Sequence, residues 1–303
     1  MAATAAAKPP PADSVVRAQE RFGRVLAAPA AIVLLVTTTI PLCYLVVTSL
    51  YSRDLSNPGS GGFVGLANYV EALGDGRFWH SLGISLIYTT STVALQLVVG
   101  MLLALAIHRI KRGAWLLRVM AIMPILLAPV VVGLVWRTLL LSPEFGIVGF
   151  VAEQFGVGIQ NWLGEPVSAL VWVIVIHTWQ WTPFCFLVFS ASLAAMPVEL
   201  EEAARLDRAS PWKRFWYVTF PLLRQAIVIV AIIRTVIALS AFDALFAATG
   251  GGPGTATEIL NLYVYRISFT ELRMGYGSAL AVILMAITFI IAAVFFRLRG
   301  ARR

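Results

Sequence analysis

The chain has 303 residues, of which 59% are hydrophobic and only 13% are charged, and its formal net charge is +8. Soluble domains are about half apolar and about a quarter charged, so this composition argues against a soluble protein and indicates a bilayer protein. The Arg and Lys residues lie in short runs between apolar stretches and form no basic face interleaved with aromatic residues, so we expect no nucleic-acid partner.

The first 24 residues are rich in Ala and Pro and then become basic, which predicts a cytoplasmic N-terminal tail. Six apolar stretches follow, and each is long enough to cross a hydrocarbon core of roughly 30 Å. These stretches are residues 25–50, 82–107, 119–141, 167–193, 222–248 and 277–297. Residues 298–303 form a short basic C-terminus. The sequence therefore predicts an all-α membrane protein with a six-helix transmembrane domain over residues 25–297.

The distribution of basic residues predicts the orientation of the six helices. Segments on one side of the predicted membrane carry four, four, five and four Lys or Arg residues, whereas those on the other side, residues 51–81, 142–166 and 249–276, carry two, none and two. Cytoplasmic loops are the ones enriched in Lys and Arg. We therefore expect a multi-pass protein of the cell inner (plasma) membrane, surrounded by lipid, with both termini in the cytoplasm.

The longest inner connection, residues 196–221, is predicted to contain two short helices. Pro197 suits the first turn of a helix, and acidic residues follow near the positive end of its dipole. Ser210 and Pro211 are typical of an N-cap and a first helical turn. A helix this short and exposed is marginal in isolation. We therefore expect another protein to pack on it.

The order Glu202-Ala203-Ala204, then Asp207-x-Ala209, Phe215 and Pro221, resembles the EAA loop of binding-protein-dependent ABC importer permeases. In that family the loop is a coupling helix that docks into a groove of a cytoplasmic ATPase. The resemblance therefore implies that residues 197–210 contact an ATPase. The implied coupling residues are Glu202, Ala203, Ala204, Asp207, Arg208 and Ala209. Arg208 stands where the family has glycine, the residue that most readily adopts a left-handed turn.

Three further segments are similar to carbohydrate-importer permeases of the maltose and glycerol-phosphate type: residues 63–69, Pro183-Phe184 and residues 249–258. The last of these resembles the first of the two paired permeases. The resemblance implies a type I ABC importer permease fold, a sister permease, two ATPase subunits, an extracytoplasmic solute-binding protein, and a sugar, polyol or sugar derivative as substrate. It also implies alternating access driven by the ATPases. ATP and Mg²⁺ would be bound by the ATPases, because this chain has no P-loop.

The Gly-rich segment around Gly251, Gly252 and Pro253 lies in the third outer connection. No Lys-Ser/Thr follows it, so a phosphate-binding loop is excluded. Two interpretations stay open: a flexible turn, or a surface that the solute-binding protein contacts.

Arg234 lies about twelve residues into the fifth apolar stretch, where a charge costs at least about 2.5 kcal/mol and indicates function. It either lines the substrate path or pairs with polar groups of the sister permease. Polar and aromatic residues also cluster in the fourth stretch, and these suit either a sugar path or a hydrogen-bonded core. The candidates are His177, Trp179, Gln180 and Thr182. Arg137 and Asp243, near the outer ends of their stretches, are expected to form an ion pair.

Other function classes fit less well. No catalytic motif or metal-ligand cluster occurs, so we expect neither an enzyme nor a metal site, and no cofactor in this chain. The alternative is a secondary transporter for a small polar solute. That class predicts inverted repeats and midplane carboxylates, and it leaves the EAA-like loop unexplained.

Overall fold

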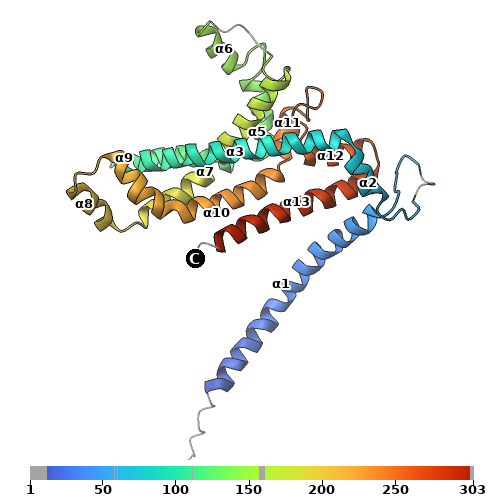
Figure 1. The fold of residues 1–303 in the computed structure, drawn as a ribbon, viewed down its shortest axis with the longest axis horizontal. Helices are drawn as coiled ribbons and strands as arrows, with labels where there is room; N and C mark the ends of the chain where they lie inside the picture. The colour runs from blue at the N-terminus through green and yellow to red at the C-terminus, as the bar shows by residue number, and fades with distance from the viewer. Residues whose placement is uncertain (1–11, 58, 60, 111, 157–160, 301–303) are drawn as a thin grey trace, which may run out of the picture.

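The computed structural model describes residues 12–57, 59, 61–110, 112–156 and 161–300, and within these ranges it is built of helices joined by loops. Four long helices lie side by side (Figure 1). They are α3 (Gly76–His108), α7 (Pro166–Ala194), α10 (Phe220–Leu239) and α13 (Met274–Gly300). A fifth, α1 (Ala12–Ser49), meets this bundle only near its C-terminal end and then projects away from it.

Five helices in the described part of the chain are long and apolar enough to cross a bilayer, and a bent helix pair makes the sixth. The all-α fold with six spans is thus confirmed. The sequence predicts that the N-terminal tail ends at residue 24, where the first span begins. In the structure α1 already begins at Ala12 and continues through that position. Residues 1–11 and 301–303 lie outside the described residues.

The third predicted span is wrong as a single straight helix. It consists of α4 (Ala114–Ile122) with the 3-10 turn η1 (Met123–Leu126), followed by α5 (Pro129–Val135) with the π-turn η2 (Trp136–Leu140), and the two halves meet at 97°. Pro129 causes the break, because proline lacks an amide donor and forces the residue before it out of the helical region. Leu127 and Ala128 have extended backbones, with ψ of 138° and 134°.

The fifth predicted span, 222–248, is also divided. The helix that begins at α9 (Pro211–Arg214) continues through the π-turn η3 (Phe215–Thr219) and α10, and it ends at Leu239. After a turn the short α11 (Asp243–Ala248) packs against α5 instead of extending the span. Gly133 permits this packing, because a Cβ there would collide with the backbone carbonyl of Ala244.

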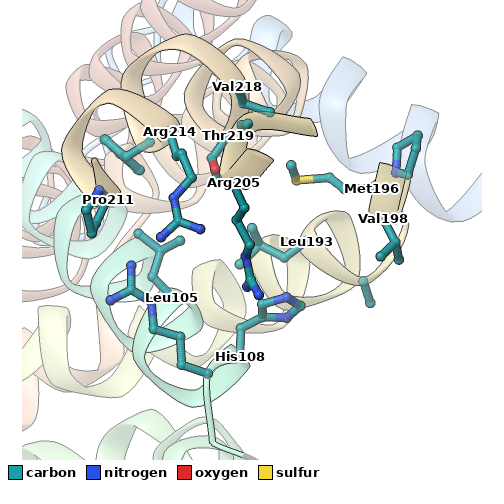
Figure 2. A pocket seen from close by; sticks show the side chains of 15 residues that line it. Leu105, His108, Leu193, Met196, Val198, Arg205, Pro211, Arg214, Val218 and Thr219 are labelled. Carbon is teal, nitrogen blue, oxygen red and sulfur yellow. The ribbon is translucent and has the colours of Figure 1, made fainter. Parts of the chain in front are cut away.

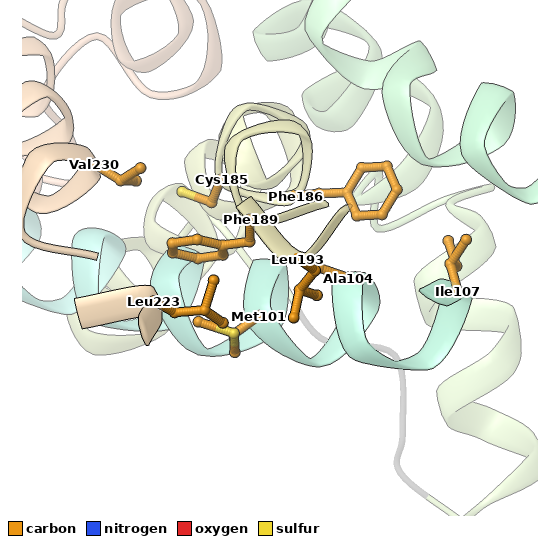
Figure 3. Packing of buried hydrophobic residues seen from close by; sticks show 9 residues of the cluster. All are labelled: Met101, Ala104, Ile107, Cys185, Phe186, Phe189, Leu193, Leu223 and Val230. Carbon is orange, nitrogen blue, oxygen red and sulfur yellow. The ribbon is translucent and has the colours of Figure 1, made fainter. Parts of the chain in front are cut away.

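The half of the bundle that contains the C-terminal ends of α3 and α7 is held by an apolar cluster in which side chains of α3, α7 and α10 interdigitate (Figure 3). The buried members are Met101, Ala104, Ile107, Cys185, Phe186, Phe189, Leu193, Leu223 and Val230. Gly100 lets α3 approach α7 closely, since a Cβ at this position would lie 2.6 Å from the Cβ of Cys185. Bundle helices in membranes are packed in this way through small residues at their contacts.

The short helices α2 (Ala67–Gly74) and α12 (Leu260–Tyr265), the latter followed by the π-turn η4 (Arg266–Thr270), lie at the end of the bundle where α1 meets it (Figure 1). Another short helix, α6 (Ile147–Gln154), lies beyond α5 and away from the four long helices. Polar contacts fix the start of α3 to α12, to α13 and to the segment that precedes α12. The Asp75 carboxylate accepts hydrogen bonds from the hydroxyls of Tyr263 and Tyr276. The buried Glu258 carboxylate accepts two hydrogen bonds from Arg77, at 2.8 and 2.9 Å.

Candidate coupling loop and substrate cavity

The inner connection contains the two predicted helices, α8 (Val198–Leu206) and α9. Ser210 caps α9 as predicted, its hydroxyl accepting a hydrogen bond from the Lys213 amide at 3.3 Å, and Pro211 occupies the first turn. Figure 1 shows α8 at the end of the bundle opposite α2 and α12.

One face of α8 is exposed and mixes acidic with apolar side chains. Glu202 and Ala203 are exposed, and so are Val198 and Leu206, at 65% and 84%. Ala204 differs, because it is only 9% exposed and faces a cavity between α8 and the rest of the chain. The side chains predicted to couple to an ATPase thus divide into outward-facing ones and an inward-facing Ala204.

The turn after α8 is a Schellman motif with a left-handed residue. The Ala209 amide donates to the Ala204 carbonyl at 3.1 Å, the Arg208 amide donates to the Arg205 carbonyl at 3.0 Å, and Arg208 has φ 54°. The structure therefore retains the turn that glycine makes in the EAA loop, with an arginine in the same conformation. Asp207 is exposed at the helix end and Ala209 is half-buried.

In the C-terminal half of α10 the side chain of Arg234 is completely buried. Its Nε donates to Oε1 of Gln96 at 2.8 Å, its Nη2 lies 3.1 Å from Nε2 of His177, and its Cζ lies 4.5 Å from the centre of the Trp181 ring. Among the described residues, no ion pair to Arg234 is found, and its Nη1 has no hydrogen-bond partner. Neutral amide, imidazole and indole groups hold this charge.

The guanidinium of Arg234 is thus held by residues of its own chain, and its role in the substrate path or toward a sister permease stays a prediction. The side chain lies inside its own chain, between α3, α7 and α10, and two of its neighbours reach a cavity. Gln96 was missed by the sequence reasoning, although an amide in the middle of an apolar stretch is a recognisable signal for a buried polar contact.

The cavity, of about 270 Å³, lies where the third and fifth spans are interrupted. It is lined by His177, Gln180 and Trp181 of α7, by Pro129, and by residues 240–245 of the turn into α11. The Gln180 Nε2 donates to the Leu127 carbonyl at 3.3 Å and so bonds one of the groups that the helix break leaves free. Its Oε1 has no hydrogen-bond partner. The site thus combines an aromatic ring with amide, imidazole and carboxylate groups.

The predicted path residues are therefore only partly brought together. His177 and Gln180 line the cavity. Thr182 is buried and its hydroxyl donates to the Thr178 carbonyl at 2.7 Å. Trp179 lies on another face of α7, 41% exposed, with its ring 5.7 Å from that of Trp136. The turn at Ser240–Asp243, which was predicted as continuous helix, supplies the remaining wall.

The Gly-rich outer loop has a defined conformation. Gly251 has φ 96°, and the Thr257 hydroxyl donates to the Gly252 carbonyl at 2.8 Å, which closes the loop on itself. Gly252 and Pro253 line a second, outer cavity of about 560 Å³ together with Arg137. Asp243 lines the cavity of about 270 Å³ at the helix breaks, which we call the inner cavity because it lies within the bundle. The expected ion pair between Arg137 and Asp243 is not formed.

Comparisons with known proteins agree with this arrangement. The profile of the family described as "Binding-protein-dependent transport system inner membrane component" matches residues 96–303. The trehalose/maltose transport system permease protein MalF of Thermococcus litoralis is 30% identical over 94% of this chain and 96% of its own length. The sulfoquinovosyl glycerol transport system permease protein SmoG of Agrobacterium fabrum is 34% identical over 90% of this chain and 88% of its own length. The sn-glycerol-3-phosphate transport system permease protein UgpA of the same organism is 36% identical over 78% and 81%.

A solved structure shows the same fold. The crystal structure of a bacterial ABC transporter involved in the import of the acidic polysaccharide alginate has a chain that superposes with a TM-score of 0.79, over 94% of this chain and 96% of its own, at 19% identity. With a six-span helical fold, an EAA-type loop and relatives of this similarity, the chain belongs to the family of inner-membrane components of binding-protein-dependent transport systems.

Proposed function

We propose that the chain is one membrane-spanning subunit of an ATP-driven importer of sugars or sugar derivatives. The relatives named above are permease proteins of transport systems for trehalose and maltose, for sulfoquinovosyl glycerol and for sn-glycerol-3-phosphate. Transport would proceed by alternating access together with a sister permease. Two ATPase subunits would drive it, and an extracytoplasmic binding protein would deliver the substrate. Both termini would be cytoplasmic.

The observation that supports this proposal most strongly is the geometry of α8. A helix of nine residues that exposes Val198 and Leu206 leaves apolar surface uncovered, and burial of such surface favours association. The Schellman turn at Arg208 holds that face in a fixed position relative to α9. An ATPase docked here would transmit its closure to α10 through the continuous helix 211–239.

The test separates the two faces of α8. Glu202→Lys and Ala203→Trp change exposed positions, so the permease pair should still assemble while the ATPase subunits are lost, or hydrolysis is no longer stimulated by loaded binding protein. Ala204→Trp is the control for the inward face, and it should damage the loop itself because Ala204 is buried. Full stimulated hydrolysis in both outward-face variants would contradict docking on this surface.

The side chains that line the inner cavity suit a sugar-like substrate. An indole ring can stack on the C–H face of a sugar, and the unpaired Gln180 Oε1 can accept a hydrogen bond from a hydroxyl. Gln180→Leu and Trp181→Ala should lower uptake in a panel of maltose, trehalose and glycerol 3-phosphate. Trp179→Ala is the matched control, since this residue lies outside the cavity. Uptake that depends on a proton gradient and not on ATP would favour a secondary transporter instead.

A further inference from the structure

A separate cavity of about 360 Å³ lies beneath the coupling loop, between α8, α9 and the inner ends of α3 and α7 (Figure 2). Part of its wall is apolar and comes from the last turns of α3 and α7, with Leu105 and Leu193, and from Phe215 and Val218 of η3. This cavity is distinct from the inner cavity at the helix breaks, with which it shares no lining residue.

The rest of its wall is basic. His108, Arg109, Arg205 and Arg214 all line it, and its described lining residues include no Asp or Glu. Figure 2 shows Arg205, Arg214 and His108 directed toward one another from three separate segments. Arginine is always charged in proteins, so an anion between Arg205 and Arg214 is attracted by both guanidinium groups. Arg205 and Arg214 already interact with other groups of the protein, and a guanidinium with five N–H donors can hold an anion in addition.

We propose that this cavity binds a phosphate group. Arginine forks match phosphate oxygens in geometry and charge, and the apolar wall can take an attached hydrocarbon part. The phosphate can come from two sources: the headgroup of an anionic phospholipid, or a soluble phosphate ester. Arg205 belongs to α8 and Arg109 follows α3, so a bound phosphate ties the coupling helix to the transmembrane core. The binding of phosphate does not depend on the proposed function. Only the effect of that binding on coupling to an ATPase rests on it.

The test uses the purified full-length chain. In nanodiscs, native mass spectrometry measures retained phosphatidylglycerol against phosphatidylcholine. In neutral detergent, the shift of the unfolding temperature with inorganic phosphate is compared with chloride at equal ionic strength. The pocket variant is Arg109→Gln with Arg205→Gln. The control is Arg112→Gln with Arg224→Gln, which removes the same charge from exposed positions outside the cavity.

We expect the wild type and the control to bind one of the two probes equally well, and the pocket variant to bind it roughly tenfold more weakly for each charged contact removed. Retention of phosphatidylglycerol alone identifies a lipid site, and a phosphate-induced shift alone identifies a soluble ligand. His108→Gln, a milder change, provides the comparison if the double variant does not fold. Equal losses in the control, or no preference for either probe, would overturn the proposal. Because no ATPase is present, the result is independent of the test of docking on α8.

Discussion

Nη2 of Arg234 lies 3.1 Å from Nε2 of His177 in the middle of the helix bundle. A guanidinium has donors only, so Nε2 accepts the hydrogen bond and the imidazole proton resides on Nδ1. One buried charge thereby fixes the tautomer of a residue that lines the inner cavity. The charge and the cavity are linked through this contact and through Trp181, whose ring lies 4.5 Å from Cζ of Arg234 and also lines the cavity.

Removal of that charge should disturb the core and not only transport. Arg234→Leu leaves Oε1 of Gln96 and Nε2 of His177 buried without a donor, which should cost about 1–3 kcal/mol for each unsatisfied group. We expect a lower unfolding temperature together with reduced uptake. Arg234→Lys should recover part of the stability, because an ammonium can serve one acceptor. Unchanged unfolding of Arg234→Leu would mean that water or another group replaces these contacts.

The turn at Arg208 should be stabilised by the residue that the family carries there. Arg208 has φ 54°, a conformation that costs a non-glycine residue about 1 kcal/mol. Arg208→Gly should therefore preserve or slightly raise the unfolding temperature and leave stimulated hydrolysis intact. Leu272→Gly, at φ 61° on the outer side, is the matched comparison for backbone strain alone. A severe loss of hydrolysis only in Arg208→Gly would show that the arginine side chain itself is needed.

Two glycines on the same helix should respond oppositely to a methyl group. Gly100→Ala places a Cβ 2.6 Å from the Cβ of Cys185 and must push α3 away from α7, so we expect destabilisation of about 1–3 kcal/mol. Gly83→Ala meets no atom within 4 Å and should be neutral or stabilising by up to about 1 kcal/mol. Thermal unfolding in one detergent compares the two. Equal effects would mean that the helices separate at no cost.

The outer end should lose stability in acid through Asp75. Burial raises the pKa of this carboxyl, but hydrogen bonds from Tyr263 and Tyr276 lower it more, so its pKa lies below the ordinary value. A lowered pKa in the folded state means that the contribution is complete above about pH 4 and is lost as the pH falls further. Asp75→Asn should unfold at a lower temperature at pH 6 and show a smaller decline toward pH 3. An identical decline in both proteins would assign the acid sensitivity to other carboxyls.

Cysteine labelling should test the orientation in the membrane. In a background that lacks Cys43 and Cys185, single cysteines at Gln154 and Thr255 should react with an impermeant thiol reagent in intact cells. A cysteine at Ala209 should react only after the membrane is opened. The distribution of Lys and Arg motivates this expectation. Labelling of Ala209→Cys from outside would reverse the topology.

The sequence predicted the class, the number of spans and the two helices of the inner connection because these depend on local composition and capping. It did not predict that spans three and five are interrupted. Hydropathy treats 119–141 as one run, and the 97° bend arises from Pro129 together with a carbonyl acceptor that Gln180 satisfies from another helix. Pro183, by contrast, stays inside α7 without ending it. Whether a proline divides a span is therefore decided by tertiary contacts.

The parts of the site that depend on consecutive residues were predicted. The parts that depend on contacts between residues far apart in the sequence were missed. The α8 segment is read from consecutive residues, but the inward face of Ala204 depends on the residues that line the cavity beneath it. Arg234 was identified as unusual from its depth alone. Its partners Gln96 and His177 are far from it in sequence, and no single stretch contains a signal that joins them.

The isolation of α1 has a mechanical consequence. Residues Leu26–Val47 are nowhere buried by the rest of the chain, whereas the outer end is fastened where the Ser49 hydroxyl and the Tyr69 hydroxyl lie 2.6 Å apart and the Asn68 amide donates to the Ser49 carbonyl. The helix α1 is therefore attached to the rest of the chain only near its C-terminal end. In bilayers of different thickness it can change its tilt, at a cost of only fractions of a kcal/mol per Å of mismatch. Such adjustment leaves the packing among α3, α7 and α10 untouched.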